Sequence, residues 1–589
     1  MQQPLEFYTN QKLIFELELS KLKRKLSVSS IARLLTFLAI ILGLYLFFGN
    51  IPIVISIIGI GVVLFVYLLF RHGDLQYKYD LNKVLIDQNN SELKILNSDY
   101  FWLDDGKEFI NPKHAYSYDI DLFGKGSFFQ YCNRTVTLEG KNELFDRLTS
   151  NDILSIEDKQ KGIKELSEKP KWRQHFSALA KLVKVDHSTN EIVSWIHNYK
   201  FSFPKYVAFL STLFSIISLL LMVLLALQII PEIILLLWFF IGLGISGAYF
   251  KKVTILYNNA GNAKDTFKQY HKLLNEIETT SFTSDILKSK QLEIKNEDEK
   301  ASIIFKKFSK LLDALDQRNN IIIGFIGNGF FLRDLKLVYN IENWIRSYNS
   351  NVENWFKVIT FFDAENSLAN FHFNHPSYVF PQINKDNLVI SANKLGHPLL
   401  KEKQRIDNDF TIENQQFFII TGANMAGKST FLRTVSLSIV MANMGLPVCA
   451  KSFEYAPIKL ITSMRTSDSL ADDESYFFSE LKRLKFIVDE IENDDYFIIL
   501  DEILKGTNST DKAIGSKKFV QKLVASNSTG IIATHDLSLC EIEKELTEVK
   551  NYYFDAEIVN DELHFDYQLK DGICKNMNAS FLLKKMKII

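Results

Sequence analysis

Cysteine is scarce in this sequence, and its cysteines lie far apart. The 589 residues contain only Cys132, Cys449, Cys540 and Cys574, none of them in a C-x-x-C pair. Structural zinc sites and disulfide frameworks both draw on closely spaced cysteines, so the sequence indicates neither. We therefore expect the soluble parts of the chain to lie in the cytosol.

A charge excess of either sign is also missing. Lys and Arg number 68 and Asp and Glu 69, which gives a formal net charge of −1. Without a global basic field, any contact with nucleic acid would need a local patch. Hydrophobic residues make up 47% and charged residues 23%, which is typical of a globular protein, and the length suggests roughly four domains.

Long apolar runs are present, and they come in two pairs. Residues 31–48 and 51–70 are almost wholly apolar and are separated by "GNIP", while 206–227 and 233–250 flank "QIIPE". Because ~20 apolar residues cross a bilayer core, these runs predict two transmembrane helical hairpins, four spans in all. The alternative is two buried core hairpins, but charge-free runs of this length are uncommon in soluble helices.

Basic residues flank the outer ends of both pairs and are missing from both turns. By the positive-inside rule, the N-terminus, residues 73–204 and everything after 252 face the cytoplasm of an inner or plasma membrane. A shorter run, "IIIGFIGNGFF" at 321–331, meets Arg333 and Asp334 too soon to cross, so it predicts a buried helix. The flanking basic residues are Lys21, Lys23, Arg24, Lys25, Arg33, Arg71, Lys200, Lys205, Lys251 and Lys252.

The stretch "IITGANMAGKSTFLR" at 419–433 fits the P-loop pattern Gly-x-x-x-x-Gly-Lys-Ser. In such a loop backbone N–H groups wrap the phosphates, the lysine reaches the β and γ oxygens, and the serine ligates Mg²⁺. ATP and Mg²⁺ are the expected cofactors. The predicted cofactor-binding residues are Gly422, Ala423, Asn424, Met425, Ala426, Gly427, Lys428, Ser429 and Thr430.

Two acids and a histidine complete the predicted chemistry. In "YFIILDE", Asp501 can hold Mg²⁺ together with Ser429, and Glu502 can orient or deprotonate the attacking water. In "IIATHD", His535 is placed to contact the γ-phosphate. The acids could instead begin a helix, and the histidine could be structural. Their order after the P-loop favours catalytic roles for Lys428, Glu502 and His535.

These motifs resemble those of a known family. "TGANMAGKSTFLR", "LDEILKGTNSTD" and "ATHDL" are similar to the ATPase motifs of the DNA mismatch-repair MutS family. "DLFGKGSFFQYCNRTVTLEGKNELFDRL" resembles the start of that family's core domain, and "DAENSLANF" and "GHPLL" resemble its segment between lever and ATPase. The resemblance covers roughly residues 85–589, interrupted by the second apolar pair.

The resemblance implies a homodimer with ATP sites at the subunit interface. It places Ser475, in "DSLADDESYFFSEL", in the partner's site, although Asp473 and Glu474 depart from the family pattern and would repel a γ-phosphate. Leu504 and Lys505 depart as well. Double-stranded DNA becomes a candidate partner. We expect no preference for mismatches, because the only Phe-x-Glu lies at 478–480 and membrane spans occupy the position of the reading domain.

The expected fold is multidomain, α and α/β, with two transmembrane hairpins, a helical core and lever region, and a C-terminal ABC-type P-loop ATPase domain with a largely parallel sheet. The expected function is a membrane-anchored, dimeric MutS-like ATPase. An ABC-type transporter subunit and an ATP-driven membrane scaffold are the alternatives; the former lacks an LSGGQ-like signature. The expected boundaries are 1–29 (cytoplasmic N-terminal helix), 30–72 (hairpin 1), 73–204 (MutS-like core), 205–252 (hairpin 2), 253–400 (lever) and 401–589 (ATPase).

Overall fold

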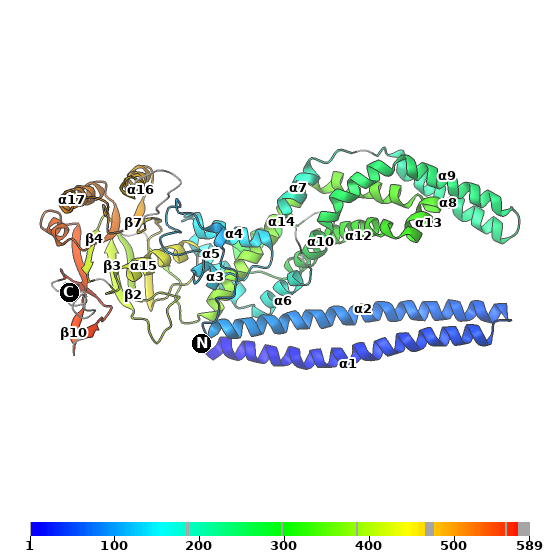
Figure 1. The fold of residues 1–589 in the computed structure, drawn as a ribbon, viewed down its shortest axis with the longest axis horizontal. Coiled ribbons are helices and arrows are strands. Elements are labelled where there is room, and N and C mark those ends of the chain that lie inside the picture. Colours follow the sequence, from blue (N-terminus) through cyan, green and yellow to red (C-terminus); the bar gives the residue numbers. More distant parts are fainter. Residues whose placement is uncertain are drawn as a thin grey trace.

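The protein is elongated, with a β-rich domain at one end and two helical arms that extend from it (Figure 1). The computed structural model describes residues 2–183, 185, 188–201, 203–295, 299–384, 387–423, 425–465, 476–559 and 562–574.

The first arm is a pair of long helices, α1 (Gln2–Leu46) and α2 (Ile51–Leu96), which lie side by side (Figure 1). Asn50 caps α2 by accepting a hydrogen bond from the Ile53 N–H. The helices approach closely at Gly61, where an added Cβ would lie 2.5 Å from Ile40. In both helices the apolar run thus continues without a break into a polar helical segment. The whole of α1 is about 68 Å long.

The second arm contains α8 (Tyr206–Ala226), α9 (Glu232–Ala248) and α10 (Phe250–Thr279). The axis bends by 61° between α9 and the start of α10. By length and composition, three described helices could cross a membrane, namely α1, α2 and α8, and a fourth is possible if the bent pair is one span.

The short apolar helix α13 (Ile321–Phe331) corrects one prediction. The helix forms at the predicted place, but it is not buried: Ile321 is 82% and Ile322 69% exposed, and only Gly327 and Gly329 are covered. The prediction of a buried helix was wrong because α13 packs on α8 and α9 but leaves its large apolar side chains between 321 and 326 exposed.

The remaining helices connect the arms to the β-rich domain. The long helices predicted between 253 and 370 are confirmed, and α14 (Arg333–Asn374) is the longest of them. Around it pack α10, α12 and the shorter helices of the segment 128–197. The other helices here are η1 (Lys107–Phe109), α3 (Phe128–Cys132), α4 (Leu138–Thr149), α5 (Ile156–Ser167), α6 (Pro170–Lys181), α7 (Thr189–His197), α11 (Asp285–Leu292), α12 (Ala301–Asp316) and η2 (Gln317–Asn319).

The C-terminal domain is built on a six-stranded sheet of order β12-β9-β4-β8-β7-β6. Its strands are parallel except for β12. They are β4 (Phe417–Gly422), β6 (Lys459–Ser463), β7 (Tyr496–Asp501), β8 (Thr529–Ala533), β9 (Val549–Phe554) and β12 (Leu569–Asp571). The parallel strands are buried along almost their whole length, as expected for a sheet covered on both faces.

A smaller sheet and several helices complete this domain. The second sheet has the order β1-β5-β2-β3, and β10 and β11 form a separate pair. The elements are β1 (Gln382–Ile383), β2 (Leu388–Leu395), β3 (Asn408–Glu413), β5 (Ser452–Tyr455), β10 (Glu557–Val559), β11 (Glu562–His564), α15 (Lys428–Asn443), α16 (Tyr476–Glu490), α17 (Ser509–Ala525) and η3 (Leu537–Lys544).

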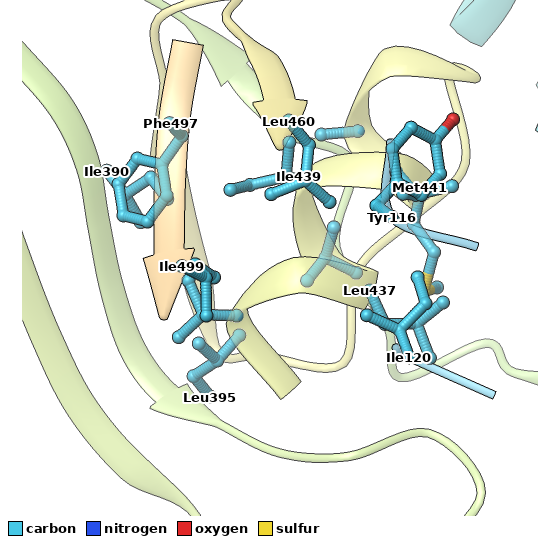
Figure 2. Close-up of a cluster of buried hydrophobic side chains, with 14 of the residues drawn as sticks. Tyr116, Ile120, Ile390, Leu395, Leu437, Ile439, Met441, Leu460, Phe497 and Ile499 are labelled. Atoms are coloured by element: carbon cyan, nitrogen blue, oxygen red, sulfur yellow. The ribbon is translucent and has the colours of Figure 1, made fainter. Parts of the chain in front are cut away.

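Helix α15 is the centre of the domain's hydrophobic core. Figure 2 shows Ile439 facing Leu460 and the strand that carries Phe497, while Met441 lies against Tyr116. The segment before α3 is therefore part of the same core as the sheet. A buried carboxylate strengthens this junction, because Asp119 accepts hydrogen bonds from the Thr462 hydroxyl (2.6 Å) and from two backbone N–H groups of residues 464 and 465.

Candidate functional site

The P-loop lies between the end of β4 and the start of α15, and its two glycines are required by the backbone. Gly422 has φ +145°, and a Cβ there would lie 2.6 Å from the Phe554 carbonyl oxygen. Gly427 has φ +106° and directly precedes α15. Residues that carry a side chain rarely adopt such φ angles, so both positions favour glycine. Glycine also lets the loop N–H groups approach a ligand closely.

Lys428 is the first residue of α15, and its side chain is buried under the loop. Its Nζ donates hydrogen bonds to the carbonyl oxygens of Gly422 (2.7 Å) and Ala423 (3.0 Å). Burial lowers the pKa of Lys428. An ammonium group held this way beside a helix N-terminus makes a strong site for phosphate oxygens.

A hydroxyl and a carboxylate meet next to the lysine. The Ser429 Oγ donates a hydrogen bond of 2.7 Å to Asp501 Oδ2 at the end of β7. Burial raises the pKa of Asp501, while this hydrogen bond opposes the rise. Mg²⁺ prefers hard oxygen ligands and is usually held by one or two protein groups together with phosphates. The donor set therefore fits Mg²⁺, with Ser429 and Asp501 as the residues that would hold it.

Glu502 and His535 form a second pair, on the adjacent strands β7 and β8. The His535 Nε2 lies 2.8 Å from Glu502 Oε1. This hydrogen bond lowers the pKa of Glu502 to about 2, and Lys505, whose Nζ lies 3.5 Å from Oε2, contributes as well. Glu502 is thus a carboxylate at neutral pH. His535 Nε2 also lies 3.4 Å from Lys428 Nζ, which joins the pair to the P-loop.

The backbone of Glu502 is unusual. Its φ of +51° is left-handed, which is uncommon for a residue with a long side chain. The conformation is held by a hydrogen bond of 2.9 Å from the Glu502 N–H to the Ala533 carbonyl oxygen. Strained backbone of this kind concentrates at functional sites, where it directs a side chain.

Lys428, Ser429, Asp501, Glu502 and His535 all line one cavity of 580 Å³. Ala423, Met425, Gly427 and Thr430 line it as well, and Ala426 is buried behind the loop. Asn424 and Ser475, with the neighbouring acids at 473 and 474, lie outside the described residues. The structure thus brings together the described P-loop residues with Asp501, Glu502 and His535.

Several lining residues were missed by the sequence analysis. His397 and Arg405 come from the segment between β2 and β3, and Tyr567 comes from the chain before β12. They add an imidazole, a guanidinium and a phenol ring to the lining of the cavity. "GHPLL" was recognised as a motif but gave no sign that its histidine lines the site, and no local pattern marks Tyr567.

The parallel sheet, the glycine loop and the paired carboxylates define a P-loop domain of the nucleotide-binding type. The family described as "MutS domain V" matches residues 418–586. The C-terminal part of the chain thus matches a domain of the MutS family, and the resemblance seen in its motifs is confirmed.

Individual relatives match over the same part of the chain. "MutS protein homolog 4" of Homo sapiens is 32% identical over 214 residues, which is 34% of this chain and 22% of that protein. "DNA mismatch repair protein MutS" of Staphylococcus haemolyticus is 27% identical over 270 residues, 44% of this chain and 30% of that protein. The protein of the same name in Aquifex pyrophilus is 32% identical over 206 residues, which is 34% of this chain and 24% of that protein. Each match thus spans less than a third of the relative.

Proposed function

We propose that this protein is a membrane-anchored ATPase of the MutS type, which binds and hydrolyses ATP and acts as a dimeric switch. The observation that carries the proposal is the placement of two pairs, Ser429 with Asp501 and Glu502 with His535, on either side of Lys428. A nucleotide-binding loop alone would suit a passive switch. The carboxylate of Glu502 adds a group that can act on water.

Each residue has a distinct role in the proposed reaction. Lys428 and the loop N–H groups bind the phosphates. Ser429 and Asp501 would hold Mg²⁺, which would supply positive charge against the charge that develops during phosphoryl transfer. Glu502 orients the attacking water and accepts its proton. His535 holds Glu502 in place through the 2.8 Å hydrogen bond and lies close enough to Lys428 to contact the terminal phosphate.

The apolar helices favour a lipid bilayer as a partner of this protein. Helices α1, α2 and α8, and the bent pair α9 and α10, have the length and composition of spans, and their apolar side chains are largely exposed. Together with the placement of Lys and Arg, this favours four spans with the N-terminus and the ATPase domain in the cytoplasm of an inner or plasma membrane.

A homodimer and DNA binding follow from the family and are proposed on that basis. Ser475 would reach the partner's ATP site, where Asp473 and Glu474 would weaken the contact by repulsion. Any binding of double-stranded DNA would be weak and salt-dependent and would not favour mismatches, because the chain is nearly neutral. The Phe-x-Glu at 478–480 lies in α16, where Glu480 accepts a hydrogen bond of 3.0 Å from the Lys505 N–H.

The test of the proposal is ATP hydrolysis by the purified full-length chain in detergent and in vesicles. We expect Mg²⁺-dependent phosphate release that is lost in Lys428→Ala together with nucleotide binding. The control is Lys451→Ala, which removes an exposed lysine of the same domain and should leave both unchanged. Turnover that is equal in the Lys428→Ala and control proteins would refute the proposed site.

A further inference from the structure

A small polar cavity lies outside the ATP site, where four helices meet near the N-terminus (Figure 1). It has a volume of 120 Å³. Tyr8 of α1, Glu92 of α2, Arg173 of α6 and Asn366 of α14 all line it. The cavity thus lies where the α1–α2 pair docks on the long helix α14.

Positive charge exceeds negative charge around this cavity. Arg134, Arg173 and Lys181 line it, whereas Glu92 is its one lining carboxylate among the described residues. Both oxygens of Glu92 are engaged, one by Arg134 Nε at 2.6 Å and the other by Asn374 Nδ2 at 2.9 Å. Arg173 therefore forms no direct ion pair with a carboxylate of the described chain, although Glu92 acts on its charge from a distance.

Several lining atoms are buried and lack a hydrogen-bond partner in the described part of the chain. Arg173, only 4% exposed, uses Nε and Nη1 on the Leu166 carbonyl (2.9 Å) and the Asn370 side chain (2.7 Å), but its Nη2 has no partner. Both amide atoms of Asn366 and the Gln174 Oε1 are also unpartnered. Burial lowers the pKa of Arg173 to about 10, so it stays charged at neutral pH. A buried, partly unsatisfied guanidinium is costly unless something supplies the missing contacts.

We propose that this cavity binds a small oxyanion of phosphate size, with Arg173 Nη2 and the Asn366 amide as the donors. A volume of 120 Å³ equals about four water molecules at ~30 Å³ each, which admits such an ion and excludes a nucleotide. The ion would join α6 to α14 beside the Tyr8 hydroxyl, which donates to Asn374 Oδ1 at 2.8 Å. It would strengthen the attachment of the first helical arm to α14.

The test is thermal unfolding of the full-length chain in detergent with inorganic phosphate, against chloride at equal ionic strength. All proteins carry Lys428→Ala, which removes the response of the P-loop. We expect phosphate to raise the midpoint temperature, and Arg173→Gln to raise the half-saturating concentration at least tenfold. The matched control is Lys171→Gln, the same charge change at an exposed position of α6.

Two further arms keep the test decisive. If Arg173→Gln fails to fold, Lys181→Gln at the exposed edge of the cavity should still weaken the phosphate response several-fold. Sulfate should replace phosphate, because the donors recognise oxygens. The proposal is overturned if phosphate stabilises no more than chloride does, which would mean that water alone fills the cavity. It is also overturned if the Arg173→Gln and Lys171→Gln proteins titrate alike.

A different observation carries a second inference, which concerns α13. This helix packs on α9 so closely that a Cβ at Gly242 would clash with the Gly329 carbonyl oxygen. The Phe239 ring lies 5.3 Å from that of Phe325 and 4.9 Å from that of Phe330. In the first turn of α13, before these contacts, Ile321 is 82% and Ile322 69% exposed.

Carbonyl groups at the end of α13 lie within hydrogen-bond distance of serine hydroxyls of α8 and α9. Ser218 Oγ donates to the Phe330 carbonyl at 2.5 Å, and Ser215 Oγ donates to the Phe331 carbonyl at 3.3 Å. Ser218 in turn accepts from Trp238 Nε1 at 2.8 Å. In water the last carbonyls of a helix need no such partners, but in hydrocarbon each must find one inside the protein.

The position of α13 along the helices also favours hydrocarbon. The Tyr206 and Tyr249 hydroxyls lie 3.3 Å apart and mark the polar ends of α8 and α9, as interfacial tyrosines do. The contacts of α13 lie between Ser215 and Ser218 on α8 and between Phe239 and Ser246 on α9, on the apolar side of that tyrosine pair. Eleven helical residues extend about 17 Å, roughly half of a ~30 Å bilayer core.

We infer that α13 is embedded in the cytoplasmic leaflet as a half-membrane helix whose exposed apolar side chains contact lipid acyl chains. The inference rests on the proposed membrane anchoring. Of the charged residues that end the apolar run, Asp334 is paired, because Arg318 lies 3.4 Å from it, and the Arg318 guanidinium lies over the Phe250 ring at 5.1 Å.

Spin labels on single cysteines in lipid vesicles test this inference, since the four native cysteines are buried. A label at Ile322→Cys should be accessible to oxygen and protected from a water-soluble nickel chelate, like one at Leu219→Cys on the exposed face of α8. A label at Lys310→Cys on α12 should show the reverse. If position 322 resembles 310 while 219 stays lipid-like, the inference about α13 is wrong and the anchoring stands. If all three are water-exposed, both are wrong.

Discussion

Replacing Glu502 by glutamine removes one negative charge from the site and changes almost nothing else. The glutamine keeps the size of the side chain and can still accept a hydrogen bond from His535, which lies 2.8 Å away in the native protein. Since the pKa of Glu502 is about 2, the native residue is ionised throughout the neutral range, and the variant loses a base that is always available. A positioned general base contributes typically 10²–10⁴-fold, so the barrier should rise by about 3–5 kcal/mol.

Binding should respond differently, because Lys428, Ser429 and Asp501 are untouched. We expect ATP affinity within about threefold of wild type, together with phosphate release at least about 100-fold slower in single-turnover experiments. Glu541→Gln, at an exposed position in η3 of the same domain, is the matched control and should hydrolyse normally. A Glu502→Gln protein with wild-type turnover would refute the assignment of the base, and one that fails to bind ATP would show that the charge of Glu502 supports binding instead.

Three further predictions concern the metal, the topology and the dimer. Ser429→Ala should raise the Mg²⁺ concentration needed for half-maximal hydrolysis about tenfold or more, because one of two oxygen donors is lost; an unchanged Mg²⁺ titration would count against the metal site. Cysteines at Asn50 and Gln228 should react with membrane-impermeant reagents from outside intact cells and a cysteine at exposed Ser150 should not, and the opposite result would reverse the orientation. Ser475→Arg should weaken ATP-dependent dimerisation measured by light scattering, and dimerisation that ignores both ATP and this change would point to association through the membrane helices.

The groups proposed as catalytic could be predicted to lie close together because each lies in a local sequence pattern. A strand followed at once by Asp501 and Glu502, and another followed by His535, place side chains at the same edge of a parallel sheet. The left-handed backbone of Glu502 depends on a hydrogen bond to the neighbouring strand, so no local pattern could show it. His397, Arg405 and Tyr567 come together only through tertiary folding, which is why they were missed.

The sequence predicted that these segments are helical, but it did not predict where the helices end or what covers them. In the first arm, the polar segments before residue 30 and after residue 70 continue the apolar helices. No local signal in the sequence marks where each of these helices ends. For α13 the error had a different origin. An apolar helix has the same composition whether protein or lipid covers it, so composition could not reveal that Ile321 and Ile322 stay exposed.

Helix α14 links the two ends of the molecule, and its attachment to α4 can be tested separately. At 42 residues it is about 63 Å long, with its first turns beside α8 and α13 and its last turns at the β-rich domain. Near that second end, buried Asp363 accepts hydrogen bonds from the Val136 N–H (3.1 Å) and from the Thr137 N–H (2.8 Å) and hydroxyl (2.6 Å), which fastens the start of α4 to α14.

Asparagine at 363 offers one acceptor oxygen in place of two and turns an amide group toward backbone donors. We expect Asp363→Asn to cost about 1–3 kcal/mol locally, which corresponds to hydrogen exchange about 5–150 times faster in the backbone of α4. Glu353→Gln, an exposed position in the middle of α14, is the control and should change exchange little, since exposed ion pairs contribute ~0–1 kcal/mol. If ATP slows exchange in α4 of the wild type but not of Asp363→Asn, this junction carries the effect of nucleotide from the sheet to α14. An equal ATP response in both proteins would mean that the signal travels instead through the core shared by α15 and the segment around Tyr116.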